Sequence, residues 1–436
     1  MYVEFMATEG NMSKIVSKLI LNFTNKAKPI LIKIFPIEVL RKIKRKLVNN
    51  IIANNTKNER FRFDRYKSPD GINVIGFVKG ETGLGQSCRM LIGALDIGDL
   101  DYTAYNYNHI SSMRQNDVTY EDKITNTTPY NINLIHINPS DLALANTTFK
   151  KNIWDYKYNI GFWLWELEEF PDEWINCFKY VDEIWTPSEF ASSAIRKKTS
   201  LPVKTIRYPI DVPTDLKIYN REYFNLPGNM FLYLIMYDCN SNTERKNPMS
   251  AIKSFKIAFS SDNKDVGIVV KINNPQDKDL QLIKEELKDY SNVFIIPKIM
   301  TKIEVNSLIR VIDVLVSLHR SEGFGLPLAE AMYLGVPTIA TKWSANTEFM
   351  NENIACMVNY KFITLEQDYG VYRKGSRWAD ADLDQAAEFM IKLYKDEKYR
   401  SILIEKAQKY ILYNLNKKIC FNDINTRIIQ IYKGEE

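Results

Sequence analysis

Two glutamates separated by seven residues, Glu322 and Glu330, stand in the segment HRSEGFGLPLAEAMYLGVPTIA (319–340). A single helix would stack both carboxylates along nearly one face. Gly323 and Gly325 argue against one helix, because glycine is costly inside a helix and favoured where the backbone turns sharply. We therefore expect Glu322 on a loop and Glu330 about one turn into the helix that follows. Glu322 suits a neutral polyhydroxylated group, and Glu330 suits a vicinal diol such as a ribose.

The residues around this pair predict an anion site. The run DVLVSLH (313–319) predicts a strand that ends just before the loop, and Pro327 occupies a natural first helical position. Gly335 is a good cap for the end of the helix, before VPTIAT (336–341) resumes as a strand. The helix start offers unpaired N–H groups and partial positive charge, and the two glycines let the backbone approach a ligand closely. A phosphate group fits this place.

Alternating strand and helix patterns must position this unit. The expected strands before residue 211 are INVIGFV (72–78), INLIHI (132–137), NIGFWLW (159–165), DEIWTPS (182–188) and VKTIRYP (203–209). After the polar stretch at 211–229, strands are expected at 230–238, 266–272, 292–299, 313–319 and 336–341. Helical patterns lie between them, including PDEWINCFKYV (171–181) and SEFASSAIRKKT (188–199). This alternation is typical of βαβ units and parallel sheets.

The pattern predicts an α/β protein with two doubly wound halves that face each other across a cleft. In such sheets, ligands bind beyond the carboxyl ends of the strands. We expect a basic helical extension at 1–70 and an N-terminal Rossmann-like domain at 71–215. A C-terminal Rossmann-like domain at 216–395 precedes helices at 396–436 that pack back across the domains.

Several motifs resemble one enzyme family. EGFGLPLAE (322–330) resembles the E-x7-E signature of the retaining glycosyltransferases of glycosyltransferase family 4, the group 1 glycosyl transferases, which have the GT-B fold. Further similar segments are GETGLGQS, DEIWTPSEF, VKTIRYPIDVP, TERKNPMSAIKSFKIAF and WSANTEFM, so the resemblance covers roughly residues 72 to 400. It implies two facing Rossmann-like domains with a cleft between them.

The resemblance also implies roles for individual residues. Glu330 would hold the nucleotide ribose and Glu322 would lie beside the donor sugar. The backbone bordering the sugar and phosphates would be that of Gly323, Phe324, Gly325 and Leu326. Lys246 matches the lysine of the pair that binds the diphosphate. The arginine of that pair is missing, because its position is Asn240, and Arg245 or Lys271 is expected to substitute.

The first half contributes less clear candidates. Where many family members have a pocket histidine, this chain reads GFWLWELEEF, so Glu166 or Glu168 stands instead, and His136 is the nearest alternative. A carboxylate among aromatic side chains is costly to bury unless it is solvated or has a functional role, so these glutamates are candidates for the site. Gly83 and Gly85 form a glycine loop that would touch the ligand, although alone such a loop is not diagnostic, and it lacks the GxGxxG spacing of dinucleotide sites.

The implied activity is retaining transfer of a hexose from a nucleoside-diphosphate sugar to a glycan or lipid-linked glycan acceptor, in synthesis of a cell-surface polysaccharide. No metal or other cofactor is expected. Asp380 and Asp382 imitate a D-x-D metal motif, but we interpret them as residues that cap a helix. Two other classes remain open: a sugar-nucleotide epimerase, and a protein of the same fold that only binds sugar nucleotides.

Charge is distributed unevenly along the chain. The net charge is +5, but residues 1–70 carry +9 and the remainder −4. The stretch IEVLRKIKRKLVNNII (37–52) predicts a basic amphipathic helix, which either lies on an anionic bilayer or packs its apolar side on the protein body. It has no interleaved aromatic residues for stacking bases, so nucleic acid is not an expected partner.

Cysteine, histidine and hydropathy patterns set the expected compartment. The five cysteines are scattered without a CxxC pair, which favours a reducing compartment, and the three histidines are far apart in sequence. Glutamates stand where a secretory signal needs basic residues, and the sequence has no 18-residue apolar run. We therefore expect a cytoplasmic protein, and the bilayer alternative for the helix at 37–52 would add peripheral contact at the inner face of the membrane.

Overall fold

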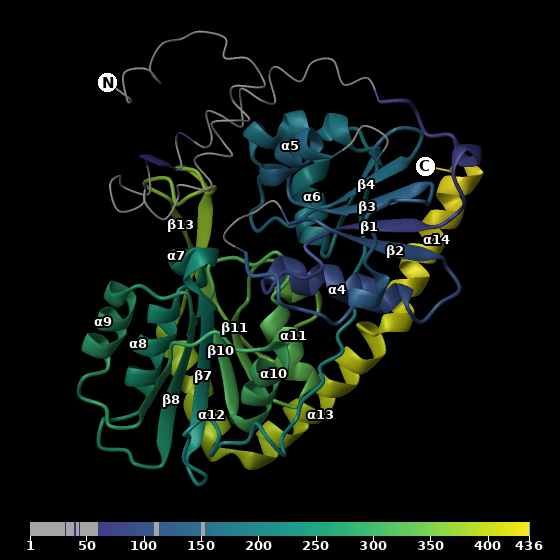
Figure 1. Cartoon of the computed structure of the whole chain (residues 1–436). Helices are drawn as coiled ribbons and strands as arrows, with labels where there is room; N and C mark the ends of the chain where they lie inside the picture. The colour runs from purple at the N-terminus through teal and green to yellow at the C-terminus, as the bar shows by residue number, and fades with distance from the viewer. Residues whose placement is uncertain are drawn as a thin grey trace. The chain divides into compact units, whose positions relative to one another are not determined.

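The computed structural model describes residues 60–108, 113–149 and 153–435, together with the isolated positions 31, 39, 40 and 43 (Figure 1). Most of the predicted basic helix lies outside these residues. The described chain divides into two compact units. The first unit contains residues 60–92, 100–163 and 172–184, and the second contains 93–99, 164–171 and 185–435. The boundary near residue 184 differs from the domain division expected at residue 215.

The N-terminal sheet has six strands. Their spatial order is β2 (Tyr102–Asn106), β1 (Ile72–Gly76), β3 (Ile132–His136), β4 (Tyr158–Phe162), β5 (Glu183–Thr186) and β6 (Val203–Thr205). The chain leaves β1 toward β2 on one side and returns to β3 on the other, so the topology switches between β1 and β3. Every residue of β1 and β3 is buried, as expected for parallel strands covered on both faces.

Three asparagines form a buried ladder across this sheet. Asn73, Asn133 and Asn159 occupy matching positions of β1, β3 and β4 and are fully buried. The amide of Asn73 donates to Asn133 Oδ1 at 2.9 Å, and that of Asn133 donates to Asn159 Oδ1 at 2.8 Å. Backbone carbonyls accept the remaining amide hydrogens, including those of Tyr130 and Ile153. Buried amides satisfied in this way fix the register of the strands.

The C-terminal sheet also has six strands. Their order is β12 (Cys356–Val358), β11 (Thr338–Thr341), β10 (Val314–Ser317), β7 (Phe231–Asp238), β8 (Val266–Asn273) and β9 (Val293–Ile296). This sheet is parallel, and its topology switches between β7 and β10. The expected strands of both halves are present. No sequence pattern predicted β2 or β12, nor the antiparallel ribbon of β13 (Tyr360–Thr364) and β14 (Arg377–Ala381).

Helices cover both faces of the C-terminal sheet (Figure 1). Apolar side chains of α8 (Pro248–Ala258), α9 (Asp277–Glu286) and α12 (Leu383–Lys395) pack on alternate residues of β7 and β8 to form one core. The opposite face carries α10 (Lys302–Val311) and α11 (Leu326–Tyr333). The other α-helices are α4 (Gly83–Leu95), α5 (Pro139–Thr148), α6 (Glu189–Arg196), α7 (Thr243–Lys246), α13 (Glu397–Asn414) and α14 (Lys417–Lys433).

Two details of the secondary structure depart from the sequence prediction. The segment expected as a helix at 171–181 is a 3-10 helix, η4 (Asp172–Tyr180), because buried residues at spacings of three and four fit either helix type. Asp382 caps α12, as predicted, by accepting the backbone N–H groups of Asp384 and Gln385. Asp380 lies instead in β14, where it pairs with Arg320.

Among the described helices, none is long and apolar enough to cross a bilayer.

Candidate active site

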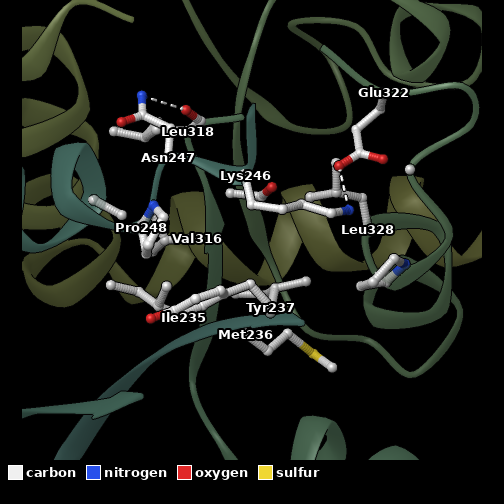
Figure 2. A pocket seen from close by; sticks show the side chains of 15 residues that line it. Ile235, Met236, Tyr237, Lys246, Asn247, Pro248, Val316, Leu318, Glu322 and Leu328 are labelled. Atoms are coloured by element: carbon white, nitrogen blue, oxygen red, sulfur yellow. Dashed lines mark hydrogen bonds and ion pairs between the residues drawn. The ribbon is translucent and has the colours of Figure 1, made fainter. Parts of the chain in front are cut away.

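A small pocket lies at the topological switch of the C-terminal sheet, beyond the carboxyl ends of β7 and β10. This is where open α/β sheets bind ligands. Figure 2 shows that its wall combines the end of β7, the start of α8, the end of β10 and the start of α11. The lining side chains include Ile235, Met236, Tyr237, Lys246, Asn247, Pro248, Val316, Leu318, Glu322 and Leu328.

Glu322 is the buried carboxylate of this pocket, with a relative exposure of 9%. Its Oε1 lies 2.5 Å from Lys246 Nζ, and its Oε2 lies 3.4 Å from an Arg245 guanidinium nitrogen. Burial alone would raise the pKa of Glu322. The neighbouring positive charges of Lys246 and Arg245 outweigh burial and lower this pKa to about 2. Glu322 is therefore ionised at neutral pH, with its charge balanced inside the pocket.

The loop that carries Glu322 is fixed by hydrogen bonds from a neighbouring segment. The Glu322 backbone N–H donates to Ser344 Oγ at 2.8 Å, and the Ala345 N–H donates to the Glu322 carbonyl at 3.3 Å. Beneath the loop, His319 is fully buried and contacts Asn346 Oδ1 at 3.1 Å through Nε2. The WSANTEFM segment (343–350) thus holds the Glu322 loop in place through Ser344, Ala345 and Asn346.

Arg245, and not Lys271, accompanies Lys246 beside Glu322. Arg245 is 3% exposed and donates to the carbonyl of Ser321 at 2.7 Å. Lys271 lies on β8 and donates to Asn273 Oδ1 at 2.5 Å, and burial lowers its pKa to about 8. Of the two predicted substitutes for the missing arginine, the structure therefore places Arg245 beside Glu322.

Glu330 is also buried, at 3% exposure, on α11. Its Oε1 forms an ion pair with Lys302 Nζ, from the first residue of α10. Sequence reasoning missed Lys302, because a lysine at the start of an amphipathic helix has no feature that separates it from a solvated surface residue. Each signature glutamate is therefore neutralised by its own lysine.

The two glycines of the signature have different structural reasons. A Cβ atom on Gly323 would lie 2.7 Å from the carbonyl oxygen of Trp165, so a side chain there would displace the 164–171 segment. Contact with Trp165 is thus a reason for glycine at position 323 that does not depend on a ligand. Gly325 has φ +94°, a left-handed conformation that precedes Leu326, the first residue of α11. The Phe324 ring is buried between Tyr208 and Phe349.

Glu166 reaches the same loop from the 164–171 segment. Its backbone carbonyl accepts a hydrogen bond from Ser321 Oγ, and its Oε2 accepts one from the Tyr372 hydroxyl at 3.2 Å. Glu168 is directed elsewhere, with its carboxylate 2.8 Å from Arg377. Of the two carboxylates that stand in place of the family's histidine, Glu166 is the one beside the residues flanking Glu322.

The candidates of the first unit lie in its core. His136 is fully buried at the end of β3, stacks on Phe162 and contacts Ser87 Oγ through Nε2 at 2.7 Å. Burial lowers the pKa of His136 to about 4, so the imidazole is neutral at pH 7. Ser87 Oγ donates to the Leu84 carbonyl, which leaves Ser87 to accept the Nε2–H of His136. This arrangement is that of a structural histidine.

The expected glycine loop of the first unit also differs from the prediction. Helix α4 already begins at Gly83, so Gly83 and Gly85 lie in its first turn. A Cβ atom on Gly85 would be 1.9 Å from the Gly80 carbonyl oxygen, which means that the loop packs on the helix at this point. At Gly83 a Cβ atom would meet open space. Close helix packing therefore explains Gly85 without a ligand.

Comparison with known proteins agrees with this geometry. Residues 240–410 match the family model of the group 1 glycosyl transferases. No curated protein matches the chain significantly in sequence. Similar solved structures include HepE of Anabaena in complex with UDP and glucose (TM-score 0.60, 10% identity, covering 83% of this chain and 100% of HepE).

Two further structures show the same likeness. A glycosyltransferase from Rickettsia africae has a TM-score of 0.59 at 12% identity, covering 85% of this chain and 100% of its own. Sucrose-phosphate synthase from Thermosynechococcus elongatus has a TM-score of 0.59 at 11% identity, covering 84% and 100%. At such identities the likeness defines the fold, which is GT-B. Together with the family match, it supports a GT-B glycosyltransferase.

Proposed function

We propose that the protein is a retaining glycosyltransferase that moves a hexose from a nucleoside-diphosphate sugar to a glycan or lipid-linked glycan acceptor. The observation that carries the proposal is the convergence of Lys246 and Arg245 on Glu322 in a pocket at the start of α11. Two cations and a helix N-terminus suit a diphosphate, and the ionised carboxylate suits the sugar next to it.

The charges of the pocket suggest how the donor is activated. Lys246 and Arg245 balance the charge of Glu322. A diphosphate would take Lys246 as its partner, so that positive charge stabilises the leaving group as the glycosidic bond breaks. Glu322 would then face the sugar ring, where positive charge develops in an oxocarbenium-like transition state. The charge on the leaving group would be neutralised by protein cations, without a metal ion.

The remaining site residues fit the other parts of the donor and acceptor. Glu330 would accept hydrogen bonds from the ribose hydroxyls, with Lys302 holding its carboxylate. Glu166 would lie on the sugar side, as the second carboxylate near the reaction centre. Retention of configuration implies that the acceptor hydroxyl attacks from the face that the diphosphate leaves.

We further propose that the enzyme works at the inner face of the membrane in synthesis of a cell-surface polysaccharide. The support is the excess positive charge of residues 1–70 and the apolar spacing within 37–51. Near an anionic surface, each basic residue contributes about 1 kcal/mol. Full-length protein should bind anionic liposomes in low salt, and a chain lacking residues 1–59 should not. Equal binding by both chains would remove this part of the proposal.

A panel of sugar nucleotides tests the activity itself. Release of nucleoside diphosphate indicates transfer or slow hydrolysis, whereas an isomerised donor indicates an epimerase, and binding without turnover indicates a non-catalytic protein. Lys246→Ala should lower kcat/KM about a hundredfold, the loss typical when one donor to a developing anion is removed. Lys256→Ala is the matched control, because Lys256 of α8 also pairs with a glutamate, Glu286 of α9, at 2.7 Å.

A further inference from the structure

One aromatic side chain contacts both the second carboxylate and the buried guanidinium of the site. Tyr372 lies in the loop between β13 and β14 and is 5% exposed. Its hydroxyl donates to Glu166 Oε2 at 3.2 Å, and its ring centre lies 5.8 Å from the Arg245 guanidinium carbon. A single residue therefore links Glu166 to Arg245, which itself lies beside Glu322.

The position of the Tyr372 ring is fixed from several sides. Trp165 and Trp378 each pack on it with ring centres 5.8 Å apart. Paired backbone hydrogen bonds with Tyr369 close the loop. The side-chain amide of Asn242, in the turn before α7, donates to the Tyr369 carbonyl at 3.0 Å. The loop is thereby attached to the segment that carries Arg245, and the phenol has little room to move.

The chemistry of this phenol is that of a permanent hydrogen-bond donor. Burial is the main cause that raises the pKa of Tyr372 far above its usual value of 10, and Glu166 and Glu322 act in the same direction. The neighbouring Arg245 charge opposes this shift but is outweighed. Tyr372 therefore keeps its proton across the working pH range. It orients a carboxylate and does not exchange protons with substrate.

We propose that Tyr372 is a positioning residue that holds Glu166 in the orientation needed for the reaction. By engaging Oε2, it leaves the other carboxylate oxygen of Glu166 to a hydroxyl of the donor sugar or the acceptor. Its ring also stabilises Arg245 through a cation–π contact, which keeps the guanidinium beside Glu322. The inference rests on the proposed function, and it adds to the site a loop that lies outside the signature segment.

Substitution of the hydroxyl alone tests the inference. Tyr372→Phe keeps the ring contacts with Trp165, Trp378 and Arg245 and removes the bond to Glu166. On the sugar nucleotide that the panel identifies, kcat should fall about tenfold, as for loss of one hydrogen bond to a charged group, with the donor KM within twofold. Tyr369→Phe is the control from the same loop and should leave both constants within twofold.

A double-substitution cycle decides between positioning and mere packing. Glu166→Gln should lower kcat at least as much as Tyr372→Phe, and the double variant should be no slower than Glu166→Gln alone. Losses that multiply, or an unchanged kcat in Tyr372→Phe, would overturn the inference. If the wild type turns over no sugar nucleotide, the proposed function fails. The same four proteins still test the contact, because their unfolding free energies should show coupling between Tyr372 and Glu166, and additive values would refute it.

Discussion

The switch points of the two sheets occupy equivalent places in the topology but are filled in opposite ways. Between β1 and β3, the end of the N-terminal sheet holds a neutral histidine and a glycine packed on backbone. Between β7 and β10, the C-terminal sheet holds Glu322 with two cations around it. The topology of each sheet thus indicates where a ligand could bind, and the buried charge of Glu322 marks the switch point of the C-terminal sheet as the candidate site.

The same physical force gives different results at the two places. Burial opposes the charged form of both His136 and Glu322. His136 has a serine hydroxyl as its partner and loses its charge, with a pKa of about 4. Glu322 has Lys246 and Arg245 and keeps its charge, with a pKa of about 2. A buried ionised group surrounded by opposite charges is costly to build, so its presence points to a ligand that exploits it.

The largest expected effect is that of removing the negative charge of Glu322 at the switch point of the C-terminal sheet. Glu322→Gln keeps the side-chain shape but leaves Lys246 and Arg245 without a counter-charge. We expect kcat to fall by roughly a thousandfold, in line with the loss of electrostatic stabilisation of a transition state. Donor turnover by nucleoside-diphosphate release measures it. Glu286→Gln, which removes the partner of Lys256, is the matched control. An equal loss of kcat in Glu286→Gln would mean that the loss in Glu322→Gln is not evidence for a role of Glu322 in catalysis.

A smaller effect is expected at the ribose position. Glu330→Ala should raise the donor KM roughly tenfold, because a charge-assisted hydrogen bond contributes about 1.5–3 kcal/mol. Lys302→Ala should also raise the donor KM, since Lys302 holds the Glu330 carboxylate. Isothermal titration with the nucleoside diphosphate separates binding from turnover. Unchanged affinity in both variants would remove the ribose assignment.

His136, at the switch point of the N-terminal sheet, is expected to affect stability and not activity. The folded-state pKa of His136 is about 4, below its usual 6.5, so the unfolded chain binds the proton more tightly. The His136 contribution is complete above pH 6.5 and declines as pH falls toward 4, by on the order of 3 kcal/mol. His136→Gln should flatten the pH dependence of the urea midpoint in this window and leave donor KM unchanged. A curve as steep as that of the wild type would contradict it.

The smallest expected effect is that of a chelator. If Lys246, Arg245 and the start of α11 neutralise the leaving group, then EDTA should leave turnover unchanged. The measurement is nucleoside-diphosphate release before and after dialysis against EDTA. Loss of turnover that Mn²⁺ or Mg²⁺ restores would mean that the charge of the site is completed by a metal.

The sequence permitted the fold and the centre of the site to be predicted, because both depend on local patterns. Strand and helix alternation located both halves, and the loop with Glu322 and the helix with Glu330 follow a strand as expected. Tyr372 and Lys302 could not be predicted, since each reaches the site through a tertiary contact with a residue distant in sequence. The packing of Gly323 on Trp165 could not be predicted for the same reason, because Trp165 lies far away along the chain.

The asparagine ladder has a consequence for how the chain reaches this fold. Its three members are separated by 60 and 26 residues, so pairing their strands closes long loops, and such long-range pairing slows folding. Apolar parallel strands can pair in several alignments of similar energy. Here a shift by one residue would bury amide groups without partners, at about 1–3 kcal/mol each. The ladder therefore penalises misaligned intermediates and directs the search toward one alignment of the sheet.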